Sequence, residues 1–205
     1  MKKWALRIGS VVLGITIIMA VWIFWNLRDR HLGYELNVAI DGSNVPGVIK
    51  VGFAAMPITP NVVDTWNDAN GDAKYNEKDG DTYNDNNNNG KFDPYWIAGF
   101  GNSRAANGVH DDVWARVVAF DDGNTRIAIV SLDAIGFRHD DVVEIRKNLP
   151  GELGVDYAII SSTHTHESND LIGIWGETPF KSGIDKENMQ YVKSQTAEAI
   201  ETAIK

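Results

Sequence analysis

The sequence predicts an α/β domain, a mixed sheet with flanking helices, preceded by one N-terminal transmembrane helix. Two observations carry this prediction: strand-type and helix-type patterns alternate after residue 48, and the twenty residues 8–27 contain no charged side chain. We divide the chain accordingly into a membrane anchor (residues 1–30), a linker (31–47) and the α/β domain (48–205), which contains a polar insert at 67–93. A chain of 205 residues is long enough for one domain with a substantial core.

The apolar run near the N-terminus has the length of a membrane span. At about 1.5 Å per residue, twenty helical residues cross a hydrocarbon layer of roughly 30 Å. Trp4, Trp22 and Trp25 lie towards its two ends, where aromatic rings favour the membrane interface. The basic residues before the run indicate a single-pass protein of the cell membrane, with residues 31–205 on the extracytoplasmic side. The alternatives are a cleaved signal peptide, which would give a secreted protein, and a buried core helix.

The charge and the cysteine content exclude several classes of protein. The chain has 19 Lys and Arg against 28 Asp and Glu, a formal net charge of −9, which argues against a nucleic-acid partner. The absence of cysteine excludes disulfides, zinc–thiolate sites and thiol nucleophiles. Any metal ion must therefore be bound by histidine, carboxylate or backbone oxygen.

Apolar runs and turn signals predict the elements of the α/β domain in order. The predicted strands are residues 48–55, 113–120, 125–132 and 157–162, and the turn formers at 121–124 indicate a hairpin between the second and third. A short helix is predicted over residues 139–149. Asp185 is a candidate cap for a final helix. The apolar positions of that helix recur at helical spacing: Met189, Val192, Thr196, Ile200 and Ile204.

The insert at 67–93 is rich in Asn, Asp and Gly and contains two patterns typical of calcium loops. Calcium takes six to eight oxygen ligands, and a glycine at the sixth position permits the sharp turn that gathers them. The second loop has that glycine, Gly90, whereas the first has Ala73. The alternative is a solvated, turn-rich loop without metal. The candidate calcium ligands are Asp68, Asn70, Asp72, Asn76 and Asp79 in the first loop and Asp85, Asn87, Asn89 and Asp93 in the second.

Three of the five histidines are candidates for a zinc site. His164 and His166 directly follow a predicted strand, and in an extended segment residues two apart point to the same side. His110 directly precedes the predicted hairpin, so that the sheet could bring it to the same edge. Neutral imidazole is the usual nitrogen ligand of catalytic zinc, which keeps one position open for water. The alternative is that these are ordinary hydrogen-bonding loop histidines, as we expect for His31 and His139.

Four stretches of the domain match, in the same order, the motifs of one known family. Residues 51–60 (VGFAAMPITP) are similar to a VGxGxxDIT-type opening strand, and residues 108–120 (GVHDDVWARVVAF) resemble a GIH…RARAF segment. Residues 129–133 (IVSLD) resemble a VSxD strand, and residues 162–166 (STHTH) a THTH signature. The chain thus resembles the N-terminal catalytic domain of the neutral and alkaline, non-lysosomal ceramidases.

This resemblance implies an amidohydrolase that uses zinc-bound water to cleave the N-acyl bond of ceramide-like lipids. The expected partners are this lipid or another amide substrate and, through the N-terminal helix, the membrane. His110 and His166 match the zinc histidines, and His164 matches a catalytic histidine that hydrogen-bonds the substrate or its oxyanion. The family's other zinc ligands, a Glu and a Tyr, and its serine have no match in this sequence, which is therefore expected to be an N-terminal part of the enzyme. Local carboxylates could replace the missing ligands: Asp112, Asp133 and Glu167.

Several positions depart from the family pattern. Met56-Pro57 replaces the opening Asp, Glu167-Ser168-Asn169 follows THTH where Ser-Gly-Pro is expected, and the insert has no counterpart. Two alternative functions therefore remain: an inactive, calcium-stabilised extracellular binding module, and a zinc hydrolase of another amide or ester.

Overall fold

The structure is a computed structural model that describes residues 2–39 and 47–205. It divides the chain into two compact units, Met1–Leu36 and Asn37–Lys205. The predicted linker spans the boundary between them, and its residues 40–46 lie outside the described part of the chain.

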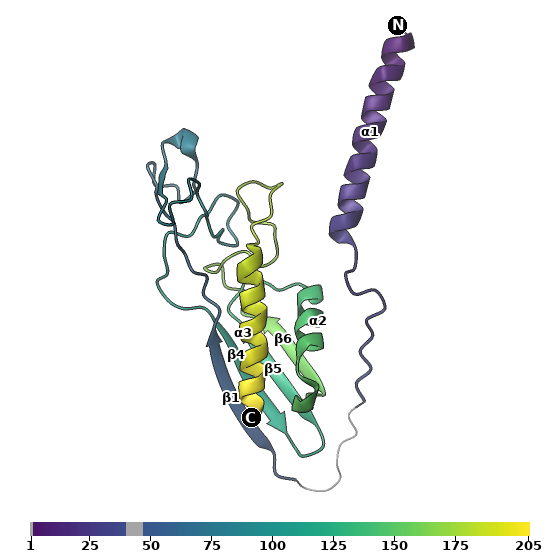
Figure 1. The fold of residues 1–205 in the computed structure, drawn as a ribbon, viewed down its shortest axis with the longest axis vertical. Helices are drawn as coiled ribbons and strands as arrows, with labels where there is room; N and C mark the ends of the chain where they lie inside the picture. The colour runs from purple at the N-terminus through teal and green to yellow at the C-terminus, as the bar shows by residue number, and fades with distance from the viewer. Residues whose placement is uncertain (1, 40–46) are drawn as a thin grey trace. The chain divides into compact units, whose positions relative to one another are not determined.

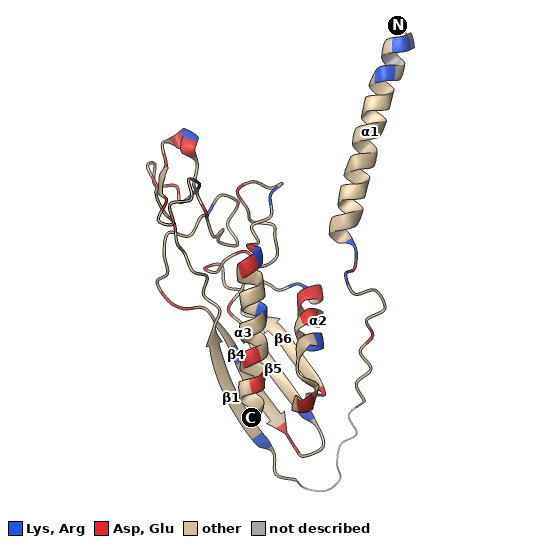
Figure 2. Ribbon diagram, in the orientation of Figure 1, with Lys and Arg blue, Asp and Glu red and all other residues tan. Residues whose placement is uncertain are grey.

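The first unit is built on one helix, α1 (Lys2–Leu27). Its stretch Leu6–Leu27 has 22 residues and a mean hydropathy of 2.3, and none of it is buried. The helix carries no charge between Arg7 and Arg28 (Figure 2). It is thus long and apolar enough to cross a membrane, as predicted, and membrane anchors and signal sequences share these properties.

The second unit is built on a four-stranded mixed sheet with the strand order β1-β4-β5-β6 (Figure 1). The strands are β1 (Lys50–Pro57), β4 (Trp114–Asp121), β5 (Arg126–Leu132) and β6 (Tyr157–Ser162). β1, β4 and β5 pair antiparallel, whereas β5 and β6 pair parallel. The predicted hairpin and the predicted strand at 157–162 are confirmed, and the predicted mixed sheet with them.

Two helices flank the sheet. α2 (His139–Asn148) connects β5 to the parallel strand β6, and η2 (Gly151–Leu153) follows it. α3 (Lys186–Ile204) begins after Asp185, whose carboxylate accepts a hydrogen bond from the Asn188 amide, so the predicted cap is confirmed. α3 packs against β1 and β4, and α2 packs beside α3 (Figure 1).

The core lies between the sheet and α3. On β4 and β5 every second side chain is buried, which is the alternation of a sheet with one covered face. Close packing is visible at Gly52, where a Cβ would lie 1.7 Å from the carbonyl oxygen of Ala203 near the end of α3. The buried apolar residues of this layer include Ala115, Val117, Ala119, Ala128, Val130, Leu132, Val192, Ala199 and Ile200.

The outer face of the sheet is apolar as well, although no described element of the second unit covers it. Phe53 of β1 is 74% exposed, and Val51, Ile129 and Ile159 are also exposed on this side. Phe53 lies opposite Val118, which lies opposite Ile129 on the next strand, so these side chains form a continuous row. The described helices thus bury one face of the sheet and leave the other open.

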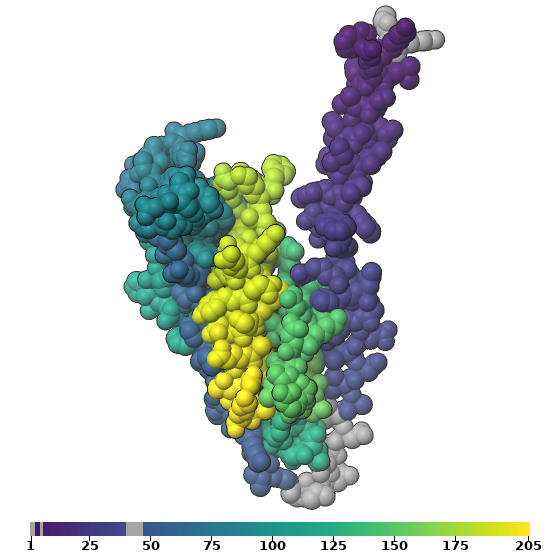
Figure 3. Space-filling view, viewed as in Figure 1, coloured from purple at the N-terminus to yellow at the C-terminus, as the bar shows by residue number. Residues whose placement is uncertain are grey.

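The polar insert forms a separate lobe beyond one end of the sheet, coloured dark teal in Figure 3. It contains a two-stranded antiparallel sheet of β2 (Thr65–Asn67) and β3 (Thr82–Asn84), with η1 (Glu77–Asp79) between them. We predicted no regular element in this part of the sequence, because its composition is almost entirely that of turns.

Candidate functional site

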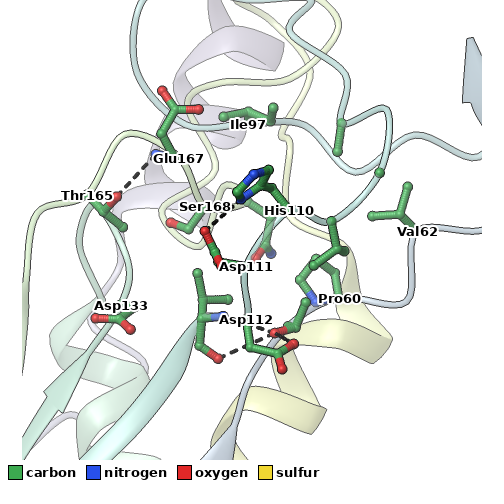
Figure 4. Close-up of a pocket in the computed structure, with 16 residues that line it drawn as sticks. Pro60, Val62, Ile97, His110, Asp111, Asp112, Asp133, Thr165, Glu167 and Ser168 are labelled. Carbon is green, nitrogen blue, oxygen red and sulfur yellow. Dashed lines mark hydrogen bonds and ion pairs between the residues drawn. The ribbon is translucent and has the colours of Figure 1, made fainter.

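A cleft of about 510 Å³ lies at the end of the sheet where β4 begins and β6 ends (Figure 4). Its walls come from the segment after β1, the segment before β4 and the segment after β6. The lining residues that carry chemistry are Thr59, His110, Asp111, Asp112, Asp133, Thr165, Glu167, Ser168 and Asn169. Of the three histidines expected to meet at this edge of the sheet, His110 lines the cleft, where it is joined by Thr165 and Glu167 of the segment after β6.

His110 stands at the exposed side of the cleft. Its side chain is 97% exposed, and its Nδ1 lies 2.7 Å from a carboxylate oxygen of Asp111 (Figure 4). A carboxylate at one ring nitrogen fixes the tautomer and the orientation of a histidine and leaves the other nitrogen as an acceptor. Nε2 of His110 is thus the atom that this residue offers to a ligand.

The carboxylates that we considered as replacement ligands have other partners. Asp112 accepts a hydrogen bond from the Thr59 hydroxyl at 2.8 Å. Asp133 accepts from the Trp114 amide at 3.0 Å and forms an ion pair with Arg116 at 2.5 Å. Glu167, 72% exposed, lies 3.6 Å from the Arg104 guanidinium. Asp112 and Asp133 are therefore hydrogen-bonded to donors of the fold, whereas Glu167 forms only a largely exposed ion pair.

The segment of His164 and His166 is not extended, so the geometric reason given for their meeting is wrong. β6 ends at Ser162, and His164 has a φ of 62°, in the left-handed region that non-glycine residues rarely adopt. The two imidazole rings nevertheless lie together, with centroids 5.1 Å apart and in an edge-to-face arrangement. Neither ring lines the cleft of His110, whereas Thr165 between them does.

His164 has a defined hydrogen-bonding state. Its Nδ1 lies 2.7 Å from the Ile135 carbonyl oxygen, which can only accept, so Nδ1 carries a proton. In the neutral ring Nε2 is then an acceptor. A hydrogen bond from His164 to an oxyanion would need the doubly protonated ring.

His166 is enclosed by a turn that we did not predict to be part of the site. Its Nδ1 is buried and has no hydrogen-bond partner. Gly99 lies against it, because a Cβ on Gly99 would be 2.2 Å from Nδ1, and the Phe100 ring lies beside it with centroids 4.7 Å apart. A metal ion on His166 would therefore bind at Nε2. In the sequence only the glycines around Phe100 hint at this turn.

The described residues contain no group of three or more His, Asp or Glu side chains that could hold a metal ion. For zinc, the donor chemistry fits only in part: imidazoles with an available Nε2 are present, but no complete ligand set is gathered among them. This absence does not extend to calcium sites, because calcium also takes Asn side chains and backbone carbonyl oxygens as ligands.

The two predicted calcium loops share most of their internal hydrogen bonds. In the first, Asp68 accepts from the amides of Asp72 and Ala73; in the second, Asp85 accepts from the amides of Asn89 and Gly90. These acceptors and donors hold positions 1, 5 and 6 of each loop. The backbone hydrogen bonds, with that of Ala73 first, hold the pKa of Asp68 below its usual value.

The ligand candidates at positions 3 and 5 make equivalent hydrogen bonds in the two loops, whereas those at position 9 do not. Asn70 and Asn87, at position 3, each accept from the amide of position 5. Asp72 and Asn89 at position 5 each accept from the amide of position 7, which is a lysine in both loops. At position 9, Asn76 donates to Asp79 in the first loop, whereas Asp93 accepts from Lys91, Asn87 and Asn89 in the second.

Each loop is held by a buried carboxylate from the other repeat. Asp81, directly before β3, binds the first loop, and Asp64, directly before β2, binds the second. Asp81 accepts from the amides of Ala69 and Asn76, positions 2 and 9 of the first loop. Asp64 accepts from the amides of Asn86 and Asp93, positions 2 and 9 of the second. Asp64 and Asp81 are only 1% and 4% exposed. The insert is therefore a pair of related loops, each anchored by a carboxylate of the other repeat, with β2 and β3 paired between them.

The anchoring residues were missed, although the sequence carries a signal for them. Residues 64–76 (DTWNDANGDAKYN) and 81–93 (DTYNDNNNNGKFD) are an internal repeat, and the anchors are its first residues. The equivalent aromatic positions pack together, with Trp66 on Tyr75, Tyr83 on Phe92 and Tyr75 on Phe92. Burial raises the pKa of Tyr75 to about 12. This repeat is the feature of the sequence that identifies Asp64 and Asp81 as equivalent residues.

No protein-family model matches the chain, and no curated protein matches it significantly. The solved structures that share its fold include two ceramidases. A ceramidase complexed with C2 superposes with a TM-score of 0.52 at 13% identity, over 77% of this chain and 21% of that one. The neutral ceramidase from Pseudomonas aeruginosa superposes with a TM-score of 0.53 at 12% identity, over 78% of this chain and 22% of that one. The chain spans about a fifth of the length of these neighbours, and the likeness shows that its fold is ceramidase-like.

Proposed function

We propose that this chain is the N-terminal part of a membrane-anchored, zinc-dependent hydrolase that cleaves the N-acyl amide bond of ceramide-like lipids. The observation that carries the proposal is the placement of His110 in one cleft with Thr165, Glu167 and Ser168. These residues belong to two segments that are distant in sequence, and both segments resemble motifs of the ceramidase family. The ceramidase-like fold supports the same reading.

In this proposal His110 and His166 would hold a zinc ion, each through its Nε2. Zinc in such a site polarises a carbonyl and lowers the pKa of a bound water to about 7. The ligand set would be completed by a cleft carboxylate (Asp112, Asp133 or Glu167) or by polypeptide that corresponds to the part of the ceramidases this chain does not span. Asp111 would orient His110 through the contact at its Nδ1.

His164 is proposed to act on the substrate. With Nδ1 bound to the Ile135 carbonyl, the neutral ring presents Nε2 as a hydrogen-bond acceptor beside His166. It can accept a proton there and, once doubly protonated, donate to a tetrahedral oxyanion. Stabilisation of such an oxyanion by one donor is worth about 3–4 kcal/mol in enzymes of known mechanism.

The apolar helix supports a lipid substrate. If α1 is an uncleaved anchor, residues 31–205 lie on the extracytoplasmic side and the substrate is supplied by the same membrane; cleavage would instead release the domain. Amide-bearing lipids are the substrates that fit the resemblance, and another amide or ester is the alternative. The acidic chain makes nucleic acid an unsuitable ligand.

Metal analysis of the purified chain tests the zinc site. We expect one zinc ion per chain in the wild type, and its loss in both His110→Ala and His166→Ala. His139→Ala, at the start of α2 and outside the cleft, is the control and should keep the metal. A wild type without zinc, or zinc retained in both cleft variants, would reject the proposal. Release of a labelled fatty acid from ceramide by the protein extended to ceramidase length tests the substrate separately.

The repeat in the insert favours a second function, that of a calcium-stabilised extracellular module. What supports it is the recurrence of oxygen-bearing residues at positions 1, 3, 5 and 9 of both loops. Calorimetric titration of the full chain with calcium should then give two sites, one lost in Asp68→Ala and the other in Asp85→Ala. Absence of calcium binding would leave the repeats as purely hydrogen-bonded loops.

A further inference from the structure

The segment Trp96–Ala105 closes around His166, and we name it the His166 clamp. Its ends pair with each other through an antiparallel bridge between Trp96 and Ala105. Its first arm pairs with the chain that follows His166, through a bridge between Ile97 and Asn169 and a hydrogen bond from the Ala98 amide to the Ser168 carbonyl. The clamp is therefore joined directly to the His164–His166 segment.

The tip of the clamp has a backbone that costs free energy. Gly99, Phe100, Gly101 and Ser103 all have positive φ, at 83°, 55°, 102° and 67°. Phe100 and Ser103 are not glycines, and such conformations persist only where the surrounding structure enforces them. Backbone strain of this kind is common beside functional side chains.

Arg104 is the residue that enforces the turn. Its side chain is only 16% exposed, and Nη1 of its guanidinium donates to the carbonyl oxygens of Gly99 at 3.1 Å, Ala98 at 3.4 Å and His166 at 3.5 Å. It also lies 3.6 Å from the Glu167 carboxylate and 5.4 Å from the centre of the Phe100 ring. A lysine has a single terminal nitrogen, so it could donate to these carbonyls but could not also place a second nitrogen beside Glu167 or a planar group towards Phe100.

We propose that Gly99 and Arg104 are positioning residues that fix the imidazole of His166. Gly99 leaves the space that the ring occupies, and Arg104 holds the turn over it, so that the ring is confined between Gly99, Phe100 and His164 and presents Nε2. The inference deepens the proposed function and rests on its use of His166. Positioning partners of metal-binding histidines commonly change metal affinity by 10- to 100-fold, although they touch no metal.

Gly99→Ala and Gly101→Ala form a matched pair for the test. Both glycines have positive φ, so alanine strains the backbone at either position. Only at Gly99 does the new Cβ meet the His166 ring; at Gly101 it meets nothing within 4 Å. Arg104→Lys and Arg146→Lys form a second pair, because Arg146 also donates to a carbonyl and lies over an aromatic ring, but on α2.

The test is an NMR experiment on the full chain in detergent micelles, with only the histidines isotopically labelled. In the wild type we expect a nuclear Overhauser effect between the rings of His166 and Phe100. Gly99→Ala and Arg104→Lys should shift the His166 ring signal and remove this effect, while Gly101→Ala and Arg146→Lys retain both. His139 serves as an internal reference. If Gly99→Ala and Gly101→Ala give the same His166 signal, the clamp does not position the ring.

Zinc affinity, measured by competition with a chelator, provides the second readout. We expect Gly99→Ala and Arg104→Lys to weaken zinc binding by at least about 10-fold and the two controls to leave it unchanged. If the wild type binds no zinc, the proposed function fails, and the NMR comparison still decides whether the clamp positions His166. Zinc affinity equal in all variants, in a wild type that binds zinc, would overturn the inference.

Discussion

The sheet and the insert belong to the same unit, but different interactions hold them. In the sheet, buried apolar side chains of β4 and β5 pack against α3. In the insert, carboxylates satisfy backbone amides, and four aromatic rings supply a small apolar centre. Apolar burial stabilises in proportion to area and depends little on direction, whereas each hydrogen bond depends on one acceptor in one place.

This difference affects how each region tolerates substitution. A core can absorb a change of shape by repacking, at a cost that grows with the cavity left behind. A loop whose amides converge on one carboxylate loses several hydrogen bonds together when that carboxylate is removed. A disruptive substitution in the insert should therefore unfold that loop alone, whereas one in the sheet should destabilise the whole second unit.

The largest expected effect is in the sheet. Leu132→Ala removes a fully buried side chain from β5 and should lower the free energy of unfolding by about 2–5 kcal/mol, measured by urea denaturation followed by circular dichroism. Ile129→Ala is the control on the opposite face of the same strand, where the side chain is 39% exposed, and should cost clearly less. Equal losses would mean that the outer face of the sheet is packed against something in solution.

The anchoring carboxylates of the insert come next. Asp64→Ala leaves the partly buried amides of Asn86 and Asp93 without their acceptor, which should cost about 1–3 kcal/mol in all. Hydrogen exchange at these two amides should accelerate, while the amides of β4 and β5 keep their protection. The residues equivalent to these in the first loop, Ala69 and Asn76, should be unaffected.

Asp81→Ala is the mirror experiment. It should release the amides of Ala69 and Asn76 and spare those of Asn86 and Asp93. If either substitution loosens both loops equally, the two repeats fold as one cooperative element and the exchange of anchors is not the main interaction.

A smaller effect distinguishes the two loops at position 6. Ala73 and Gly90 occupy this position with φ of 60° and 81°, a conformation that costs a non-glycine residue about 1–2 kcal/mol. Ala73→Gly should therefore stabilise the first loop and Gly90→Ala destabilise the second, each by about 1 kcal/mol in thermal unfolding. If both substitutions changed the thermal stability in the same direction, the positive φ would not be what determines the stability of the two turns.

The sheet was predictable from the sequence because its signals are local and periodic. The hairpin at 121–124, the strand at 157–162 and the cap at Asp185 each depend on neighbours in the chain. The clamp was not predictable, because Gly99 and Arg104 acquire their roles from contacts with His166, more than sixty residues away. The anchoring residues Asp64 and Asp81 were predictable in part. The repeat that identifies them is visible in the sequence, but that each one binds the loop of the other repeat follows only from the pairing of β2 with β3.

The smallest expected effect is an acid-dependent step that Asp93 adds to the second loop. Hydrogen bonds from Lys91, then Asn87 and Asn89, lower the pKa of Asp93 to about 2. A carboxyl group with a lowered folded-state pKa stabilises the fold above its ordinary value near pH 4, and this contribution is lost as the pH falls through about 2. The first loop has Asn76 at the equivalent position, which does not titrate. Acidification should therefore perturb the amide signals of residues 85–93 around the Asp93 titration, and Asp93→Asn should abolish that step. The lowered pKa of Asp68 predicts a step in the first loop that this substitution leaves in place, which separates the two contributions.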